Sequence, residues 1–169
     1  MPRRLLRDTK IVVDEWRYVA EAAADAAAPL IVTLAQWQLE PDTWLARGTP
    51  LGVVLAPAHR VEQLAPDLRH FVLVAAEFSG PSEGRGYTQA RQLREHWKFR
   101  GELRATGYVR RDQLFFMARC GFNSFELPDT DLEDAFTAFS TFTAAYQPAN
   151  DSGLANKLGA RVPAAGAPV

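Results

Sequence analysis

Short, nearly continuous runs of aliphatic and β-branched residues recur along the chain from residue 30 to residue 127. Strands buried on both faces of a parallel sheet have such unbroken apolar runs, whereas half-exposed strands alternate apolar and polar residues. The runs lie at residues 30–34, 51–56, 71–76, 103–106 and 124–127. The pattern therefore predicts about five mainly parallel strands.

Between these runs, the apolar positions are spaced as on one face of a helix. We expect a short helix at residues 61–68, which Pro66 weakens or ends, and further helices over residues 90–97 and 114–118. Gly121 is well placed to end the last of these helices. Strands that alternate with helices about every 20 residues favour an α/β fold of repeated βα units with right-handed crossovers. The sheet is expected to be open and doubly wound, with an incomplete TIM-like barrel as the alternative.

A final helix is predicted from residue 130, where Thr130 and Glu133 have the spacing of a capping box. Its apolar stripe is rich in phenylalanine, which suits either a core or an interface. The stripe consists of Leu132, Ala135, Phe136, Phe139 and Phe142.

The chain divides into three segments. Residues 1–27 contain one β-like run, at residues 11–13, and are expected to form an N-terminal strand or hairpin arm. Residues 28–146 hold the repeating pattern and are predicted to be a single α/β domain, because 169 residues suffice for one proper core. Residues 147–169 are rich in small residues, Pro and Gly without a stripe, which is typical of a disordered tail.

Charge is distributed unevenly along the chain. The net charge is only -1, so the overall balance gives no reason to expect nucleic acid or an anionic membrane as a partner. The segment from Arg85 to Arg119, however, contains eight arginines and Lys98 against three acidic residues, a local net charge of +6. This segment is the place to look for a negatively charged ligand.

Several kinds of site are disfavoured. The single cysteine, Cys120, excludes a disulfide within the chain and any metal site that needs several cysteines. His59, His70 and His96 lack metal-ligand spacing, so no metal site is predicted. No apolar run approaches the roughly 20 residues of a membrane helix, and no leader is recognisable, so a cytoplasmic protein is expected. The sequence identifies no cofactor, because there is no nucleotide-binding fingerprint.

A long loop with three glycines, residues 77–86, follows the third apolar run and opens onto a helix. In parallel α/β sheets, ligands bind where strands lead into helices, and helix N-terminal amides favour anions. Arg85 would add a bidentate donor to such a pocket. Neither GxxxxGK[ST] nor GxGxxG is present, so an ordinary turn is the alternative.

Three arginines besides Arg85 are candidates for anion binding. Arg91 and Arg94 lie on one helix face, where they either reach a facing loop or form a solvated basic surface. Arg104 lies inside a predicted buried strand, and a buried guanidinium needs a partner such as Glu126 or Glu77. It is therefore either part of a structural ion pair or a residue that lines a site.

We expect Arg85, Arg94 and Arg104 to converge at one rim of the sheet, facing a groove. Glu83 and Asp112 are candidates for proton transfer, although Asp112 is also explained by the helix dipole. Cys120 has the surroundings of a small buried hydrophobe, with a reactive thiol as the alternative.

The run EGRGYTQARQLREHWKFRGELRATG, continued by RDQLFFMARCGFNSFEL, resembles the signature of a bacterial domain family of unknown function. Its members are described as oxidoreductase-like and are linked with assimilatory sulfite reduction, beside the sirohaem-containing sulfite or nitrite reductase. The resemblance covers about residues 28–145. Two positions depart from the family pattern: Glu83 stands where Asp is more frequent, and Tyr108 stands where Asp is common.

The resemblance and the charged segment together define the predicted function. We expect an accessory protein of sulfite or sulfate assimilation, whose arginine-rich edge binds a small anion or docks on a sulfite or nitrite reductase. The anion-binding candidates are Arg85, Tyr87, Arg91, Arg94 and Arg104, with Gln113 and Arg119 as further candidates.

Two alternatives stay open. One is an enzyme that acts on a small phosphorylated or carboxylated metabolite, with Glu83 or Asp112 as the proton-transfer group. The other is a non-catalytic scaffold subunit that binds through the final phenylalanine-rich helix. The sequence does not fix the oligomeric state, and a homodimer is compatible with either alternative.

Overall fold

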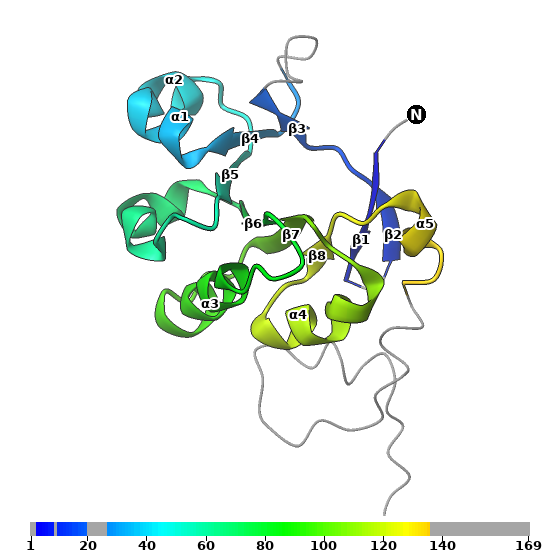
Figure 1. The fold of residues 1–169 in the computed structure, drawn as a ribbon. Coiled ribbons are helices and arrows are strands. Elements are labelled where there is room, and N and C mark those ends of the chain that lie inside the picture. Colours follow the sequence, from blue (N-terminus) through cyan, green and yellow to red (C-terminus); the bar gives the residue numbers. More distant parts are fainter. Residues whose placement is uncertain (1–2, 9, 20–26, 136–169) are drawn as a thin grey trace, which may run out of the picture.

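The computed structural model describes residues 3–8, 10–19 and 27–135. Eight strands form one sheet in the order β2-β1-β8-β7-β6-β5-β4-β3. All neighbouring strands from β3 to β8 are parallel, whereas β1 is antiparallel to both β2 and β8. The sheet curls into an open half-barrel with its larger helices on the outside (Figure 1).

The strands confirm the positions of the predicted apolar runs but exceed their number. The count of about five is too low because the N-terminal segment supplies three more strands, two of which are short runs containing arginine. The strands are β1 (Arg4–Arg7), β2 (Lys10–Val13), β3 (Arg17–Tyr18), β4 (Leu30–Thr33), β5 (Leu51–Leu55), β6 (Leu73–Phe78), β7 (Glu102–Gly107) and β8 (Ser124–Phe125).

The helices are short and often irregular. Pro66 lies in a 3-10 segment. Gly121, with φ +111°, ends the helix at Leu114–Cys120, as the sequence predicted. Two helices between β4 and β5 were not predicted. The helical segments are α1 (Leu34–Leu39), α2 (Pro41–Ala46), η2 (Val61–Gln63), η3 (Ala65–His70), α3 (Arg85–Arg91), the π-helical η4 (Gln92–His96), η5 (Arg111–Gln113), α4 (Leu114–Cys120) and α5 (Asp129–Leu132).

Strands β3 to β8 follow one another across the sheet in the order of the sequence. A doubly wound sheet would instead reverse its order where the crossovers change sides. The doubly wound prediction is therefore wrong, and the incomplete barrel describes the sheet. Because right-handed crossovers without a reversal keep the helices on one side, they cover the outer face of the half-barrel (Figure 1).

The two faces of the sheet differ in chemistry. On the outer face, side chains such as Leu103 and Ala105 join the main apolar core under the helices. Arg104, between them in β7, points to the concave face, because successive side chains of a strand alternate. A small apolar cluster on that face contains Trp16, Ile31, Leu73 and Ala75.

The N-terminal segment closes part of the concave face. Residues 14–18, which we call the strap, run from the β1–β2 hairpin at one edge of the sheet to β3 at the other edge. On the way, Asp14 contacts Arg104 in β7, and Tyr18 contacts Glu126 just after β8. The predicted hairpin arm is thus built into the sheet.

The final helix begins differently from the prediction. Its N-cap is Pro128, without a side-chain cap, so Thr130 lies inside α5 and does not form the expected capping box. Leu132 and Ala135 are buried in the main core. Phe136, Phe139, Phe142 and residues 147–169 lie outside the described residues, so the rest of the stripe and the tail stay predictions.

Candidate functional site

Arg104 is fully buried and forms the centre of a charged cluster on the concave face. Its guanidinium donates to both carboxylate oxygens of Asp14 at 3.1 Å, and twice to Oε1 of Glu102, at 2.9 and 3.0 Å. A fifth bond, of 3.1 Å, reaches Oε1 of Glu126, one of the two predicted partners. All five N–H donors of an arginine are therefore used within the protein.

The three carboxylates of this cluster stabilise the protonated form of Arg104. Burial by itself lowers the pKa of Arg104, but the negative charges of Glu102, Asp14 and Glu126 outweigh it and raise the pKa above its ordinary value. Since no donor is left for a ligand, the structural ion-pair alternative fits Arg104, and a direct anion-binding role does not.

Tyr18 extends the cluster toward the carboxyl ends of the strands. Its hydroxyl donates to Oε1 of Glu126 at 2.7 Å, and the Thr106 hydroxyl donates to Oε2 of the same carboxylate at 2.8 Å. Burial, and next the charge of Glu126, raises the pKa of Tyr18 well above its ordinary value. Arg3 covers the other side of the Tyr18 ring, with its guanidinium carbon 4.9 Å from the ring centre.

Arg94 is a clamp between loops. Its Nε donates to the carbonyl of Gly121 at 3.0 Å, and its Nη1 donates to the carbonyls of Phe99 and Gly101 at 2.7 and 2.9 Å. Burial, and next the nearby charge of Arg100, lowers the pKa of Arg94 to about 10. The side chain thus joins the turn before β7 to the end of α4, and it faces the interior.

The predicted anion pocket at the start of α3 is filled by the chain's own carboxylate. Oε1 of Glu83 accepts from the backbone N–H of Arg85 at 2.9 Å and from its Nε at 3.0 Å, while Oε2 accepts from its Nη2 at 3.0 Å. The side-chain and backbone hydrogen bonds from Arg85 lower the pKa of Glu83. Glu83 is therefore ionised at neutral pH, which does not suit a general acid.

The outer surface of α3 and α4 brings several predicted residues together. The Tyr87 ring lies 5.1 Å from the ring of Phe78 below it and 5.0 Å from the ring of Phe116, which is 50% exposed. Arg91 lies one helical turn from Tyr87, and a hydrogen bond to the sulfur of Cys120 raises its pKa. We call Tyr87, Arg91 and Phe116 the α3–α4 face.

The remaining candidates lie around this face. Asp112 is exposed, and its charge contributes to the raised pKa of Tyr87, although burial is the largest cause. The Gln113 side chain accepts a hydrogen bond from the Arg110 backbone and serves as a local cap. Arg119 places its guanidinium carbon 5.9 Å from the ring centre of Phe115. Cys120 is buried, as expected of a small hydrophobe.

The three arginines expected at one rim do not converge. Arg85 is exposed at the start of α3, Arg94 is turned into the space behind α4, and Arg104 lies on the other face of the sheet. Sequence reasoning also missed Asp14 and Tyr18. No pattern could have found them, because Asp14 contacts a residue 90 positions further along the chain and Tyr18 contacts one 108 positions further along.

Other site types find no support in the part of the chain that the structure describes. Within residues 3–8, 10–19 and 27–135, no three His, Cys, Asp or Glu side chains are grouped closely enough to hold a metal ion. In the same ranges, no helix combines the length and the apolar composition needed to cross a bilayer.

Comparison with known proteins identifies a family. A family model described as a bacterial protein of unknown function (DUF934) matches residues 52–155. The matched region runs from β5 through α5 and contains the α3–α4 face, but it does not include the strap. No curated protein matches the sequence.

Proposed function

Because the chain belongs to the DUF934 family of bacterial proteins, whose description names no activity, we propose a function that rests on its surface chemistry. The protein is an accessory factor that docks on a partner enzyme through the α3–α4 face. The sequence resemblance points to a sulfite or nitrite reductase of sulfate assimilation as that partner. The reductase is thus the part of the proposal that depends on the resemblance alone.

The exposure of Phe116 carries the docking proposal. A phenylalanine that is half exposed on a helix leaves apolar surface in water, and it does so here beside a second aromatic ring, that of Tyr87. Tyrosine and arginine are enriched among the residues that dominate binding energy at interfaces, and Arg91 lies one helical turn from Tyr87 on α3. The α3–α4 face therefore has the composition of an interface centre.

The charge around the face favours an acidic partner surface. It belongs to the +6 segment, and Arg85, which is 66% exposed, adds a further cation at the start of α3. Complementary charge mainly accelerates and orients association, while buried aromatic contacts provide affinity. An acidic patch with an apolar centre on the partner would satisfy both requirements.

Direct binding of a small anion receives less support than docking. Glu83 occupies the N-terminus of α3, and the donors of Arg94 and Arg104 are already used by carbonyls and carboxylates. The enzyme alternative is weakened because the hydrogen bonds from Arg85 lower the pKa of Glu83, which makes its carboxylate a weaker proton acceptor. The scaffold alternative depends on phenylalanines beyond residue 135, outside the described residues.

Calorimetric titration of the full-length protein into purified bacterial sulfite reductase, and separately into nitrite reductase, tests the proposal. We expect binding to one of them, weakened at least about tenfold by Phe116→Asp and by a smaller factor by Arg91→Glu. Leu39→Asp is the matched control, because Leu39 is 78% exposed on α1, away from the face, and its loss should leave affinity unchanged.

Each result has a definite meaning. Failure of the wild-type protein to bind either reductase would reject the proposed partner. Binding that survives both Phe116→Asp and Arg91→Glu would reject the α3–α4 face as the contact.

A further inference from the structure

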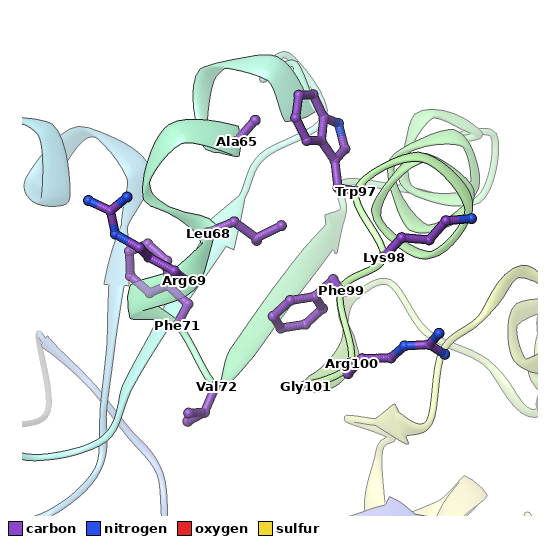
Figure 2. A pocket seen from close by; sticks show the side chains of 10 residues that line it. All are labelled: Ala65, Leu68, Arg69, Phe71, Val72, Trp97, Lys98, Phe99, Arg100 and Gly101. Atoms are coloured by element: carbon purple, nitrogen blue, oxygen red, sulfur yellow. The ribbon is translucent and has the colours of Figure 1, made fainter.

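A groove of about 470 Å³ opens at the amino-terminal edge of β6 and β7 (Figure 2). One wall is the end of η3 with the segment that enters β6, including Leu68 and Val72. The other is the turn from η4 into β7, including Trp97 and Phe99. We call it the Trp97 groove. Arg91, the residue of the α3–α4 face that is nearest in sequence, lies six helical residues or about 9 Å before Trp97. None of the three residues that define the α3–α4 face lines the groove, so the two sites are distinct.

The wall on the β7 side is built from unusual backbone. The helix widens to a π-turn at Gln92–His96, closed by a hydrogen bond of 3.1 Å from the Trp97 N–H to the Gln92 carbonyl. Lys98 then adopts a left-handed conformation, with φ +54°. Both features are uncommon and occur preferentially at functional sites. Together they turn the side chains of consecutive residues to different sides of the wall.

The same wall is fixed from behind. Arg94 holds the carbonyls of Phe99 and Gly101 at 2.7 and 2.9 Å, as described above. Gly101 is required where the two walls meet, because a Cβ at this position would collide with the carbonyl of Val72 and the ring of Phe99. The groove is thus preformed, which reduces the entropy lost on binding.

The interior of the groove is apolar. Leu68 and Phe99 face each other across it in Figure 2, with the Trp97 ring above them. Val72 is 52% exposed, and Trp97 is only partly buried, so this apolar surface is open to solvent. A pocket of this size and composition suits a large apolar side chain.

The charged side chains that line the groove are all cationic. Arg69 comes from one wall, and Lys98 and Arg100 come from the other. Among the described residues that line the groove, none is acidic. Arg100 also contributes to the lowered pKa of Arg94, which shows that positive charge accumulates behind the wall.

The directions of these cations indicate the shape of the occupant. In Figure 2, Arg69 extends outward on one side of the apolar floor, and Lys98 and Arg100 extend outward on the other side. A compact anion inside the groove would not reach both sides. We propose that the Trp97 groove binds an acidic peptide segment of a partner protein, with one large apolar side chain inserted and carboxylates on either side of it.

The aliphatic floor favours a peptide over a nucleic acid. Single-stranded nucleic acids stack their bases on exposed aromatic rings along a continuous basic track. Here the aliphatic lining residues are Ala65, Leu68 and Val72. Of the three aromatic lining residues, Phe71 and Phe99 are almost buried, at 4% and 7% exposure, so only the Trp97 ring is available for stacking. Because no residue of the α3–α4 face lines the groove, this inference does not depend on the identity of the docking partner proposed above.

Fluorescence anisotropy with the full-length protein tests the inference. The probe is a fluorescein-labelled nonapeptide with four Asp or Glu residues on each side of a central Phe. One control peptide replaces the Phe with Gly, and a second replaces the acids with Asn and Gln. A labelled thymidine nonanucleotide serves as the competing anion. We expect the first peptide to bind at least about tenfold more tightly than the other three probes.

Two exposed variants identify the site without disturbing the fold. Val72→Asp places a negative charge at the groove and should weaken binding at least about tenfold. Lys98→Gly removes a cation, so it should weaken binding by about threefold. The protein should stay folded, because glycine adopts the left-handed conformation of residue 98 without strain. Arg60→Glu is the control, because Arg60 is an exposed arginine outside the groove.

The opposite results are equally clear. Equal binding of the Phe and Gly peptides, or tighter binding of the oligonucleotide, would overturn the proposal of an acidic peptide with an apolar anchor. Absence of binding by the first peptide, or binding unaffected by Val72→Asp in a protein with unchanged circular dichroism, would overturn the site itself.

Discussion

The concave face of the sheet and the outer layer of helices both contain arginine, but they differ in what the arginine contacts. On the concave face, Arg104 is fully buried and gives all five donors to three carboxylates. On the outer side, Arg85 is 66% exposed and shares its charge with one carboxylate beside it, that of Glu83. Both arginines belong to the same +6 segment.

This difference shows how little a local charge count says about function. Burial turns the charge of Arg104 into a structural link between β7 and the strap, because an unpaired guanidinium there would be strongly unfavourable. Exposure leaves Arg85 bonded to Glu83 and still accessible to a partner. The segment therefore contributes both to the stability of the fold and to its outer surface.

The largest expected effect is on the concave face. Arg104→Met removes the cation and leaves the Asp14 carboxylate buried without its main partner, so the free energy of unfolding should fall by about 3–5 kcal/mol. Urea denaturation measures this loss. Arg85→Ala is the matched control and should leave the unfolding transition unchanged. If the two substitutions had similar effects, the contrast between the faces would be wrong.

A smaller loss is expected for the clamp inside the outer layer. Arg94→Ala leaves three carbonyls without their charged donor, which should cost about 2–3 kcal/mol of unfolding free energy. Arg94→Lys keeps the charge but cannot reach three carbonyls in fork geometry, so most of the loss should remain. Full stability of the lysine variant would mean that charge alone, without the fork, is sufficient.

The smallest change in the free energy of unfolding is expected for Tyr18→Phe, and this change depends on pH. Because the pKa of Tyr18 is raised in the folded protein, its contribution is fully present below the ordinary tyrosine pKa of about 10 and is lost as the pH rises above it. Tyr18→Phe should cost about 1 kcal/mol at neutral pH. It should also make the decline in stability between pH 9 and 11 less steep, as followed by urea denaturation at each pH. An unchanged decline would show that this phenol ionises normally.

Parts of this picture were accessible from the sequence. The apolar runs located β4 to β8, because strands that are buried on both faces have unbroken hydrophobic sequences. Arg104, within such a run, signalled a need for a carboxylate, and Glu126 supplies one. Tyr87 and Arg91 were both candidates from the sequence, and they lie one helical turn apart on α3, but nothing in the sequence placed Phe116 of α4 against Tyr87.

The rest depended on long-range geometry. Asp14 could not be assigned to Arg104, because nothing in the local pattern places the strap across the half-barrel. Arg94 was expected beside Arg91, but α3 passes into the wider π-turn after Arg91, which changes the direction of the side chains that follow. The order of the sheet was ambiguous for a similar reason, since strand spacing alone does not say on which side each crossover passes.

The pairing of β1 with β8 has a consequence during synthesis on the ribosome. Leu6 lies opposite Phe125, so β1 is synthesised more than a hundred residues before the strand that it pairs with, and this pairing is delayed. At bacterial rates of elongation this delay is on the order of ten seconds. During this delay, Leu5 and Leu6 lack the neighbours that bury them in the folded protein. The arginines on either side, Arg4 and Arg7, place charge on this waiting edge and oppose its association with other chains.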